Sequence, residues 1–404
     1  MDCRRRNAGA VLVTRLRVLS LSTLYPNSNA PNFGVFVERQ MQAVAVRGDV
    51  DLVLVNPLGL PPFPLSLHPR YRALRGLDLV EQRGGVTVMR PRFTVLPGTG
   101  GRFSARAEAA AVLPLARRLH AAQPFDLIDA QFFYPDGPAA LRIAQALGLP
   151  SSIKARGADV HYWGHAPGTA QQVRAAALGA NGLFAVADGL ANDLAALGVS
   201  RSKITVHRTG LDRAVFRPLD RAECRRKLSL PIDQPVLACV GALIERKGQC
   251  FAIEALAQVP GAVLVLAGAG PDEAGLRALA VSLGVTERVR FLGAVPHADL
   301  PVVLSAADLF VLPTASEGLA NAWVEALACG IPVVTTPLPG AQELLTDPVY
   351  GRMAARDPAA IASAVKELLA APPPRDAVLA GAADFSWEAN AAALVAYWHT
   401  LAAG

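Results

Sequence analysis

The stretch PTASEGLANAWVEALACGIPVV at residues 313–334 places two glutamates, Glu317 and Glu325, after a short apolar run. That run, DLFVLPT at 308–314, predicts a buried strand, and the residues that follow predict a helix beginning near Leu319. Glu325 then lies two turns along this helix, roughly 10–12 Å from Glu317. A buried strand followed by a helix is the repeating unit of an α/β fold.

The start of this predicted helix is a candidate phosphate site. The backbone N–H groups of Gly318, Leu319 and Ala320 point out of it, and a helix start favours anions. Carboxylates beside such a site, here Glu317 and Glu325, accept hydrogen bonds from sugar and ribose hydroxyls. A purely structural interpretation fits the same spacing, with Glu317 capping the helix and Glu325 solvated or paired.

Short apolar runs separated by amphipathic, Ala-rich stretches recur along the whole chain. In the first half they are VDLVLVNP at 50–57, FDLIDA at 125–130, GLFAVA at 182–187 and KITVHRTG at 203–210. In the second half they are PVLACVGAL at 235–243, GAVLVLAGAG at 261–270, VRFLGAV at 289–295, DLFVLPT and IPVVTTP at 331–337. Runs of this kind are typical of strands covered on both faces. The alternation predicts two doubly wound parallel sheets.

A polar segment with three prolines, residues 211–235, separates the two series and has no sustained strand pattern. We therefore predict an N-terminal domain over residues 1–210 and a C-terminal domain over 211–384. The end of the chain, residues 385–404, has apolar residues at helical spacing and two tryptophans. We expect it to form a helix that packs against the rest of the protein.

A second motif, GALIERKGQ at 241–249, follows a predicted strand and presents Arg246 and Lys247 just before Gly248. Cations at the carboxyl end of such a strand face the crevice where ligands of doubly wound sheets bind. They suit a diphosphate. A surface loop with two solvated cations is the alternative.

Two glycine motifs are less specific. GAGPDE at 268–273 has Glu273 where a dinucleotide fingerprint requires glycine, and a tight turn with Pro271 starting a helix explains it. PNFGVFVERQ at 31–40 offers Gly34 before an amphipathic helix, where a backbone can approach a ligand closely. A plain helix start explains Gly34 equally well.

The charge of the chain is unevenly distributed. Residues 1–210 hold 24 Lys and Arg against 13 Asp and Glu, whereas residues 211–404 hold 15 against 20. A basic first half suits an anionic membrane face or a pyrophosphate-linked acceptor. Scattered arginines that only keep the protein in solution explain the count equally well. Nucleic acid is not an expected partner, because no basic helix or aromatic-basic platform accompanies the charge.

The composition of the 404-residue chain, 52% hydrophobic and 18% charged, suits two domains with large cores. Its five widely spaced cysteines include no CxxC pair, so we expect reduced packing residues. The start resembles a signal peptide, but Arg15 and Arg17 interrupt its apolar run early. No stretch reaches the roughly 18 apolar residues of a membrane span. We expect a cytosolic protein, soluble or peripheral at the inner face of the cytoplasmic membrane.

Taken in order, the motifs resemble the retaining glycosyltransferases of family 4, which have the GT-B architecture. The series is the Gly34 loop, RGADVH at 156–161, TGLD at 209–212, RKG at 246–248, GAGP at 268–271, FLGAV at 291–295, SEGLANAWVEALACGIPVV at 316–334 and the terminal SWE helix. The resemblance covers nearly the whole chain. It implies two Rossmann-like domains that face a cleft, with the terminal helix crossing back onto the first domain.

The resemblance assigns roles in a donor site. In that family the first glutamate of the pair contacts the donor sugar and the second the ribose hydroxyls, which implies these roles for Glu317 and Glu325. The diphosphate-binding cations fall on Lys247 and Arg246. Many members carry Arg directly after the strand glycine, where this chain has Ala242. Arg246 either supplies that missing charge or lies outside the site.

Further donor contacts follow from the same resemblance. The family's Glu-Gly is usually followed by Phe and Gly, and here Leu319 and Ala320 take those places, with N–H groups still free for phosphate. Val295 lies where the family's main chain meets the base. Gly34 brings the first domain close to the donor.

On the acceptor side, many relatives have an HG-x-D sequence that faces the sugar, and this chain has Arg156 and Asp159 at its ends. A fixed cation at Arg156 suits a phosphate or an acidic acceptor, whereas a structural pair with Asp159 is the alternative. His161 is a second candidate, although a lone histidine is more often a packing or surface residue.

The resemblance implies transfer of a hexosyl group from a UDP- or GDP-sugar, with retention of configuration and no cofactor. No Asp or His triad with metal-ligand spacing appears, so we expect the cations and helix starts to neutralise the leaving diphosphate without a metal. The expected acceptor is lipid-linked or an oligosaccharide, in surface-glycan biosynthesis. A nucleotide-sugar epimerase of the same architecture and a non-catalytic nucleotide-sugar-binding protein are the alternatives.

Overall fold

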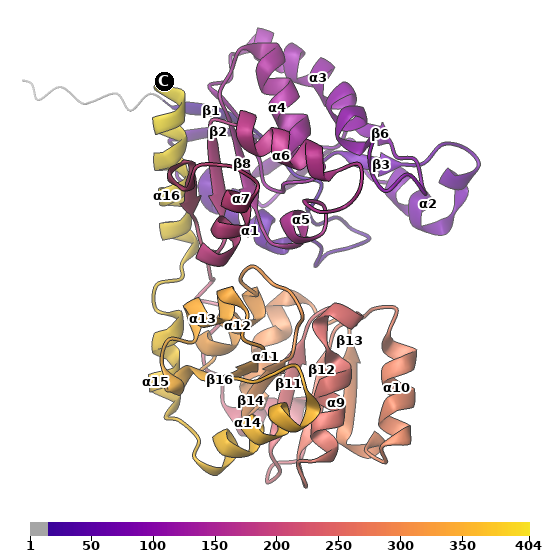
Figure 1. Cartoon of the computed structure of the whole chain (residues 1–404), viewed down its shortest axis with the longest axis vertical. Helices are drawn as coiled ribbons and strands as arrows, with labels where there is room; N and C mark the ends of the chain where they lie inside the picture. Colours follow the sequence, from indigo (N-terminus) through magenta and orange to yellow (C-terminus); the bar gives the residue numbers. More distant parts are fainter. Residues whose placement is uncertain (1–14) are drawn as a thin grey trace, which may run out of the picture.

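The computed structural model describes residues 15–404, so Cys3 and the apolar start at 8–14 lie outside it. The first of two main sheets has eight strands in the order β10–β9–β8–β7–β1–β2–β5–β4 (Figure 1). The strands are β1 (Leu16–Leu21), β2 (Val50–Val55), β4 (Val80–Arg83), β5 (Val86–Met89), β7 (Leu127–Ala130), β8 (Ser151–Ala155), β9 (Gly182–Ala185) and β10 (Ile204–Val206). The central strands are short apolar runs, as expected for a sheet covered on both faces.

The helices of this first domain are α1 (Val35–Ala45), α3 (Ser104–Ala122), α4 (Asp136–Leu147), α5 (Ala158–His161), α6 (Ala170–Gly179) and α7 (Asp188–Ala196). The predicted parallel sheet needs one correction at its edge, where β4 pairs antiparallel with β5. Gly84 and Gly85 join these strands with φ of 57° and 81°. Two successive left-handed residues make the tight turn of a two-residue hairpin, which reverses the chain.

A small lobe projects from the side of the first domain, where Figure 1 labels α2, β3 and β6. Its elements are β3 (Leu58–Leu60), η1 (Leu65–Leu67), α2 (Pro69–Arg75) and β6 (Arg92–Thr94), with β3 and β6 paired as a separate two-stranded sheet. We call residues 57–77 and 91–103 the projecting lobe. Its strands are too short and too rich in neighbouring proline and glycine to give a sequence signal.

The second sheet has six parallel strands in the order β13–β12–β11–β14–β15–β16. The strands are β11 (Val236–Val240), β12 (Val263–Ala267), β13 (Val289–Gly293), β14 (Leu309–Leu312), β15 (Val333–Thr335) and β16 (Gly351–Met353). The helices are α8 (Arg221–Lys227), α9 (Gln249–Ala257), α10 (Glu273–Ser282), α11 (Leu300–Ala306), α12 (Asn321–Ala328), α13 (Pro339–Leu344), α14 (Pro358–Ala370) and α15 (Arg375–Leu379). The helix expected from Pro271 begins at Glu273, after a turn that includes Asp272. The two-sheet α/β fold predicted from the sequence is confirmed.

Each sheet has one point where the strand order reverses. In the first sheet β2 lies on one side of β1 and β7 on the other; in the second, β12 and β14 flank β11 in the same way. The loops that follow such neighbouring strands diverge and leave a crevice at the carboxyl edge, where ligands of these sheets bind. We call these places the first and second switch points.

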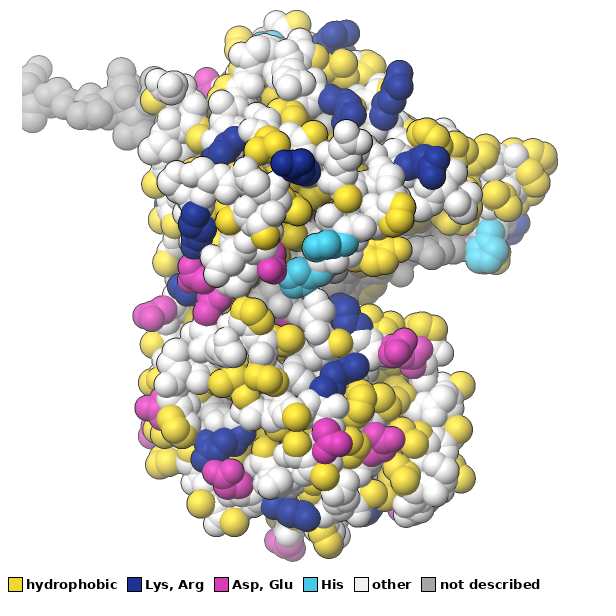
Figure 2. All heavy atoms as spheres, viewed as in Figure 1, with side chains coloured by type: hydrophobic (Ala, Val, Ile, Leu, Met, Phe, Trp, Pro, Cys, Tyr) yellow, Lys and Arg dark blue, Asp and Glu magenta, His cyan; other side chains and the backbone are white. Residues whose placement is uncertain are grey.

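The two switch points face each other across the gap between the domains. Asn32, from the loop after β1, donates its side-chain N–H to the Val295 carbonyl at 2.9 Å. His161 of the first domain lies 2.7 Å from the hydroxyl of Ser316 in the second. Figure 2 shows the surface hollowed between the domains on the side of the projecting lobe.

The C-terminal helix α16 (Trp387–Ala402) runs back along the first domain (Figure 1). Trp398 is fully buried in that domain's core and donates its indole N–H to the Ser152 hydroxyl at 3.2 Å. Trp387 packs on Gly210, where a Cβ would come within 2.2 Å of the indole ring. The predicted return of the terminal helix to the first domain is confirmed.

Helices α7 and α13 make a further contact between the domains. The Glu343 carboxylate accepts the backbone N–H groups of Asp188 and Gly189 at 2.9 and 2.8 Å. These N–H groups begin α7, so a carboxylate of one domain caps a helix of the other. Among the described residues, no helix is long and apolar enough to cross a bilayer.

Candidate active site

Two loops meet at the second switch point, one after β11 and one after β14. Gly248 has φ of 73° and lies so close to the other loop that a Cβ would come within 2.1 Å of the Pro313 carbonyl oxygen. This approach lets the Arg246 carbonyl accept the Ala315 N–H at 2.8 Å and the Thr314 hydroxyl at 3.1 Å. The two loops are therefore fixed to each other before any ligand binds.

Glu317 lies between the two cations predicted to bind a diphosphate. Its Oε1 accepts from Lys247 Nζ at 2.6 Å and from Arg246 Nη1 at 2.8 Å. Thr314 donates its hydroxyl to the same oxygen at 3.1 Å. Burial alone raises the pKa of Glu317, but the charges of Lys247 and Arg246 outweigh it and hold the pKa below its ordinary value. The sequence motifs SEGL and ERKG thus form one charged cluster.

This cluster has one carboxylate for two cations and so keeps an excess positive charge. The predicted diphosphate ligand would carry the charge that these cations favour and would compete with Glu317 for them. Arg246 also donates to the Ser316 carbonyl, which holds its guanidinium at the cluster. The cation therefore lies beside Glu317, although Ala242 occupies the position directly after the strand glycine.

The loop before α12 departs from the predicted helix start. The helix begins at Asn321 rather than Leu319, because Ala320 is extended, with φ of −72° and ψ of 119°. The loop before the helix is closely packed, since a Cβ on Gly340 would lie 1.8 Å from the Gly318 carbonyl oxygen. Within the described part of the chain, no acceptor is recorded for the N–H groups of Gly318, Leu319 or Ala320. These groups lie ahead of the helix instead of inside its first turn, and their role in phosphate binding stays a prediction.

Glu325, on the second turn of α12, is buried and paired with a residue that the motif analysis did not identify. His297 Nε2 lies 2.8 Å from its Oε1. The ring of His297 in turn contacts the Phe216 ring, with centroids 4.9 Å apart. His297 follows Val295 by two residues, and that proximity to an expected base contact is the only sequence signal that points to it.

The Gly34 loop reaches the second domain through Asn32, whose amide holds the Val295 carbonyl. Gly34 itself has φ of 74°, and a Cβ there would lie 2.5 Å from the Leu24 carbonyl oxygen. Its glycine is therefore required by the packing of its own loop. In this structure the Asn32 amide bonds to the carbonyl of Val295, the residue whose main chain is expected to meet the base.

Arg156 is held at the end of β8 by neutral partners. Its Nε donates to the Gln131 carbonyl at 2.6 Å, and its Nη2 donates to the side-chain oxygens of Gln40 and Gln131 at 2.8 and 2.7 Å. The guanidinium also lies 4.9 Å from the centre of the Phe36 ring. Burial lowers the pKa of Arg156 to about 10, although the Asp159 charge opposes that shift.

Asp159 is fully buried and organises the backbone around Arg156. Its carboxylate accepts the N–H groups of Phe133, Arg156 and Gly157 at 2.7–3.1 Å. Burial raises its pKa, and these backbone hydrogen bonds oppose the shift. Asp159 thus joins the loops after β7 and β8 instead of pairing with the Arg156 guanidinium, and its buried carboxylate does not reach the gap between the domains.

His161 bridges the domains. Its Nδ1 lies 2.7 Å from the Ser316 hydroxyl, and its Nε2 lies 2.9 Å from Asp193 Oδ2. Ser316 directly precedes Glu317, so His161 connects the predicted acceptor side to the charged cluster. Gly157 makes a tighter approach to the same loop, because a Cβ there would lie 2.9 Å from the Gly318 nitrogen.

The structure therefore gathers the predicted site residues around the gap between the switch points. The cluster of Glu317, Lys247 and Arg246 lies on one side, and Arg156 and His161 lie on the other. Among the described residues, no group of three or more His, Cys, Asp or Glu has an arrangement that could hold a metal ion. The roles of these residues in binding and transfer stay predictions.

Comparison with known proteins finds a matching family model and relatives that align with about half of the chain or more. The model of the family "Glycosyl transferases group 1" matches residues 220–383. The chain is similar to the putative teichuronic acid biosynthesis glycosyltransferase TuaC of Bacillus subtilis (strain 168), with 30% identity over 335 residues, 81% of this chain and 83% of that protein. It is also similar to the D-inositol 3-phosphate glycosyltransferase of Mycobacterium bovis (strain BCG / Pasteur 1173P2), with 36% identity over 212 residues, 49% of this chain and 44% of that protein.

Solved structures share the architecture. Sucrose-phosphate synthase from Thermosynechococcus elongatus has a TM-score of 0.79 at 22% identity, over 96% of this chain and 100% of that chain. Anabaena HepE in complex with UDP and glucose has a TM-score of 0.72 at 19% identity, again over 96% and 100%. At these identities the likeness concerns the fold, and it confirms the predicted GT-B architecture.

Proposed function

The chain belongs to the group 1 family of glycosyl transferases, and on that premise we propose that it is a retaining, metal-independent hexosyltransferase. Its donor is a UDP- or GDP-sugar, and its acceptor is lipid-linked or an oligosaccharide. The observation that carries this proposal is the cluster in which Glu317 Oε1 lies 2.6 Å from Lys247 Nζ and 2.8 Å from Arg246 Nη1. A cation pair held beside a carboxylate suits a ligand that joins a diphosphate to a sugar.

Donor binding exchanges the partners of this cluster. Lys247 and Arg246 bind the diphosphate oxygens, and the N–H groups of residues 318–320 complete its hydrogen bonds. Glu317, released from the two cations, accepts hydroxyl groups of the hexose. Glu325 gives up its contact with His297 and accepts hydrogen bonds from the ribose hydroxyls of the nucleotide.

Transfer then needs no protein nucleophile. The bond between the anomeric carbon and the leaving phosphate oxygen breaks, while the acceptor oxygen bonds to the same face of that carbon. The acceptor proton passes to the departing phosphate oxygen. Lys247 and Arg246 stabilise the negative charge that develops on the diphosphate. Such electrostatic stabilisation is usually the largest single contribution to lowering the barrier of the reaction. Arg156 offers a fixed positive charge to an acidic or phosphate-bearing acceptor.

The setting of the reaction is surface-glycan biosynthesis, at the inner face of the cytoplasmic membrane. The long relative TuaC has teichuronic acid biosynthesis in its name, which supports a role in building a glycan. The excess of Lys and Arg in residues 1–210 supports contact with an anionic membrane or a phosphate-linked acceptor.

The test is a donor screen with a lipid extract and with soluble oligosaccharides as acceptors. We expect release of UDP or GDP that depends on the acceptor, and a product one hexose heavier by mass spectrometry. Proton NMR of the product should show the anomeric configuration of the donor. EDTA should leave the rate unchanged. Inverted configuration or strict dependence on added metal would contradict the mechanism, and rearrangement of the donor without an acceptor would indicate an epimerase.

A further inference from the structure

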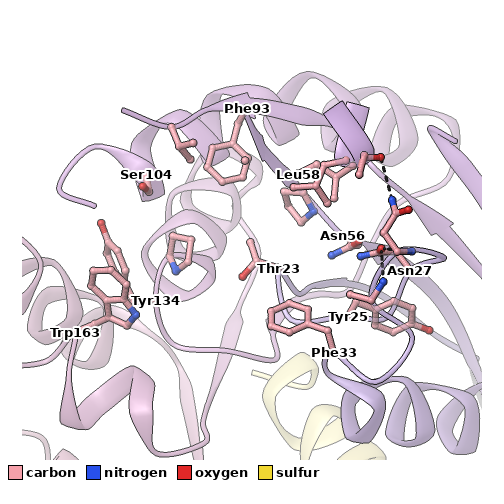
Figure 3. Close-up of a pocket in the computed structure, with 18 residues that line it drawn as sticks. Thr23, Tyr25, Asn27, Phe33, Asn56, Leu58, Phe93, Ser104, Tyr134 and Trp163 are labelled. Carbon is pink, nitrogen blue, oxygen red and sulfur yellow. Dashed lines mark hydrogen bonds between the residues drawn. The ribbon is translucent and has the colours of Figure 1, made fainter. Parts of the chain in front are cut away.

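A cavity of about 530 Å³ lies at the first switch point (Figure 3). Its walls come from the loops after β1, β2 and β7, the projecting lobe, the start of α3 and the segment after α5. Aromatic and aliphatic side chains form most of its surface, including Tyr25, Phe33, Leu58, Leu74, Phe93 and Trp163. Its volume and apolar lining are those of small-molecule sites, and a crevice at a switch point is where such sites occur.

Several polar side chains that line this cavity already bond to the protein itself, whereas the buried Tyr25 hydroxyl has no partner among the described residues. Asn27 Oδ1 accepts the Asn29 and Ala30 N–H groups at 3.0 and 3.1 Å. Asn56 donates to the Ser22 carbonyl at 2.8 Å, and the Tyr134 hydroxyl donates to the Gly101 carbonyl at 2.7 Å. A sugar brings hydroxyl groups on all sides, and each needs a partner when it leaves water. The apolar majority of the lining favours a hydrocarbon over a sugar.

The projecting lobe, which forms one wall of the cavity, has a surface that combines exposed apolar side chains with arginines. It exposes large apolar side chains, of which Phe63 is 78% exposed, together with Leu65, Leu67, Leu96 and Phe103. Its two segments, 57–77 and 91–103, contain five arginines and no Asp or Glu. Figure 2 shows hydrophobic side chains gathered on this projection. Apolar side chains interspersed with arginines, in segments without Asp or Glu, complement a hydrocarbon chain with an anionic head.

The cavity also lies beside the gap where transfer is proposed. Phe33 lines it and directly follows Asn32, which bonds to Val295 of the second domain. Trp163 lines it and follows His161 by two residues, and His161 contacts Ser316. The cavity therefore borders two segments that contact the second domain. In Figure 3 the Thr23 side chain lies between Trp163 and Phe33 at the centre of the cavity.

We propose that this cavity binds the hydrocarbon chain of a lipid-phosphate acceptor, with the projecting lobe as the side from which the lipid arrives. The inference rests on the proposed function, because it takes the acceptor to be lipid-linked. The chain fills the apolar space, and the head extends toward Arg156 and the donor. The arginines of the projecting lobe attract the anionic lipid but carry no part of the transfer.

The test measures binding of alkyl phosphates of increasing chain length to the full chain by calorimetry, below their micelle concentrations and without donor. Each methylene that enters the cavity should strengthen binding by up to about fourfold. The affinity should rise with chain length until the cavity is full and then level off. Equal affinity for short and long chains would overturn the proposal.

A cavity-filling variant makes the test specific. Ala73→Trp adds a large ring to the wall formed by α2, so affinity should level off at a shorter chain. Ala110→Trp, an exposed alanine of α3 outside the cavity, is the matched control and should behave as the wild type. If Ala73→Trp does not fold, as judged by circular dichroism, Leu74→Ala replaces it and should extend the rise to longer chains. A chain-length profile that neither cavity variant changes would contradict the assignment.

The two proposals fail in different ways. Alkyl phosphate binding needs no nucleotide, so a chain-length profile that Ala73→Trp shortens supports the cavity even if no UDP- or GDP-sugar reacts. Conversely, transfer to soluble oligosaccharides with no chain-length dependence would support the glycosyltransferase and overturn the lipid site. Competition by a soluble oligosaccharide against octyl phosphate, with the length profile absent, would assign the cavity to a glycan.

Discussion

The two switch points occupy equivalent places in the two sheets, yet they hold positive charge in opposite ways. In the second domain Lys247 and Arg246 share one carboxylate, Glu317, at the surface of the gap. In the first domain Arg156 and the buried Lys154 lie among neutral acceptors, and Gln40 Oε1 is near both of them, at 2.8 and 3.5 Å. The second domain holds its cations in ion pairs with a carboxylate. The first domain holds its cations with neutral hydrogen-bond acceptors.

The pKa shifts record the same difference. Ion pairing with Lys247 and Arg246 holds the pKa of Glu317 low despite burial. Burial, with the Arg156 charge as the second cause, lowers the pKa of Lys154 well below its ordinary value. His207, next to Lys154, has its pKa lowered to about 2 by burial and then by that lysine. Ion pairing stabilises the charged form of Glu317, whereas burial destabilises the charged forms of Lys154 and His207.

The difference suits two different tasks for the two domains under the proposed function. A cation that must exchange its partner for a diphosphate needs a counter-ion that can leave, as Glu317 can. On the proposed function Arg156 orients an acceptor, and such a cation gains from the rigid setting that Gln131 and Gln40 provide. The apolar cavity lies in the same domain as this second arrangement, at the first switch point.

The largest expected effect breaks the charged side of the comparison. Lys247→Ala removes the cation nearest to Glu317 and should lower kcat by about 100- to 1000-fold, the cost typical of losing one group that stabilises transition-state charge. Steady-state release of nucleoside diphosphate measures it. Lys366→Ala, an exposed lysine of α14, is the matched control and should keep full activity. Full turnover by a folded Lys247→Ala variant would remove the diphosphate assignment.

A smaller effect sharpens the comparison by removing only the counter-ion. Glu317→Gln keeps the shape of the cluster but frees Lys247 and Arg246 from a competing carboxylate. Nucleoside diphosphate without a sugar should then bind roughly threefold to tenfold more tightly, in line with a charge-assisted hydrogen bond. Turnover of the nucleotide sugar should fall, because the hexose loses its charged acceptor.

The matched control for that variant is Glu367→Gln, which removes an exposed glutamate paired with Arg352 and should change neither quantity. Calorimetry with UDP and GDP measures the binding step apart from turnover. Weaker binding of the nucleoside diphosphate by Glu317→Gln would mean that Glu317 does not compete for the cations. The cations of the second switch point would then exchange their protein partners for a ligand no more readily than those of the first.

The sequence predicts the second switch point far better than the first. Glu317 and Lys247 each follow a strongly apolar strand, and loops after neighbouring strands of one sheet converge, so their proximity follows from the pattern. Their ion pair does not follow from the pattern. The motifs assign each residue a ligand contact and give no information about what the residue contacts when no ligand is bound. The helix start at Asn321 was also missed, after a loop in which Gly318 packs closely on Gly340.

The first switch point depends on contacts that leave no local signal. The cavity takes Tyr25, Leu74, Phe93 and Trp163 from four segments far apart in the chain, and each alone looks like an ordinary core residue. The buried cations are similar, since Lys154 lies inside a strand of otherwise unremarkable composition. Such features come from tertiary packing and are found only once the sheet order is known.

The smallest expected effect tests whether the first domain suppresses charge by burial. His207 donates Nε2–H to the Asn390 carbonyl at 2.8 Å, which leaves Nδ1 to accept from Lys154 at 2.6 Å. Its folded pKa of about 2 lies below the value of about 6.5 for an unfolded chain. Below pH 6.5 the unfolded state therefore binds a proton that the folded state does not. This contribution to stability is present above pH 6.5 and is lost as the pH falls, by about 1.4 kcal/mol per pH unit.

In His207→Gln this loss disappears, while the amide still offers Lys154 a hydrogen-bond acceptor. The wild type should be the more stable protein at pH 7, and its advantage should shrink by about 2 kcal/mol by pH 5. Urea unfolding of both proteins at pH 7, 6 and 5 measures the difference, and the opposing contribution of Asp136, whose pKa is raised to about 7 by burial, cancels in it. His165→Gln, at an exposed position of the same domain, should preserve the wild-type pH profile. An advantage that is constant with pH would mean that His207 is not held neutral, and the contrast between the two switch points would then rest on geometry alone.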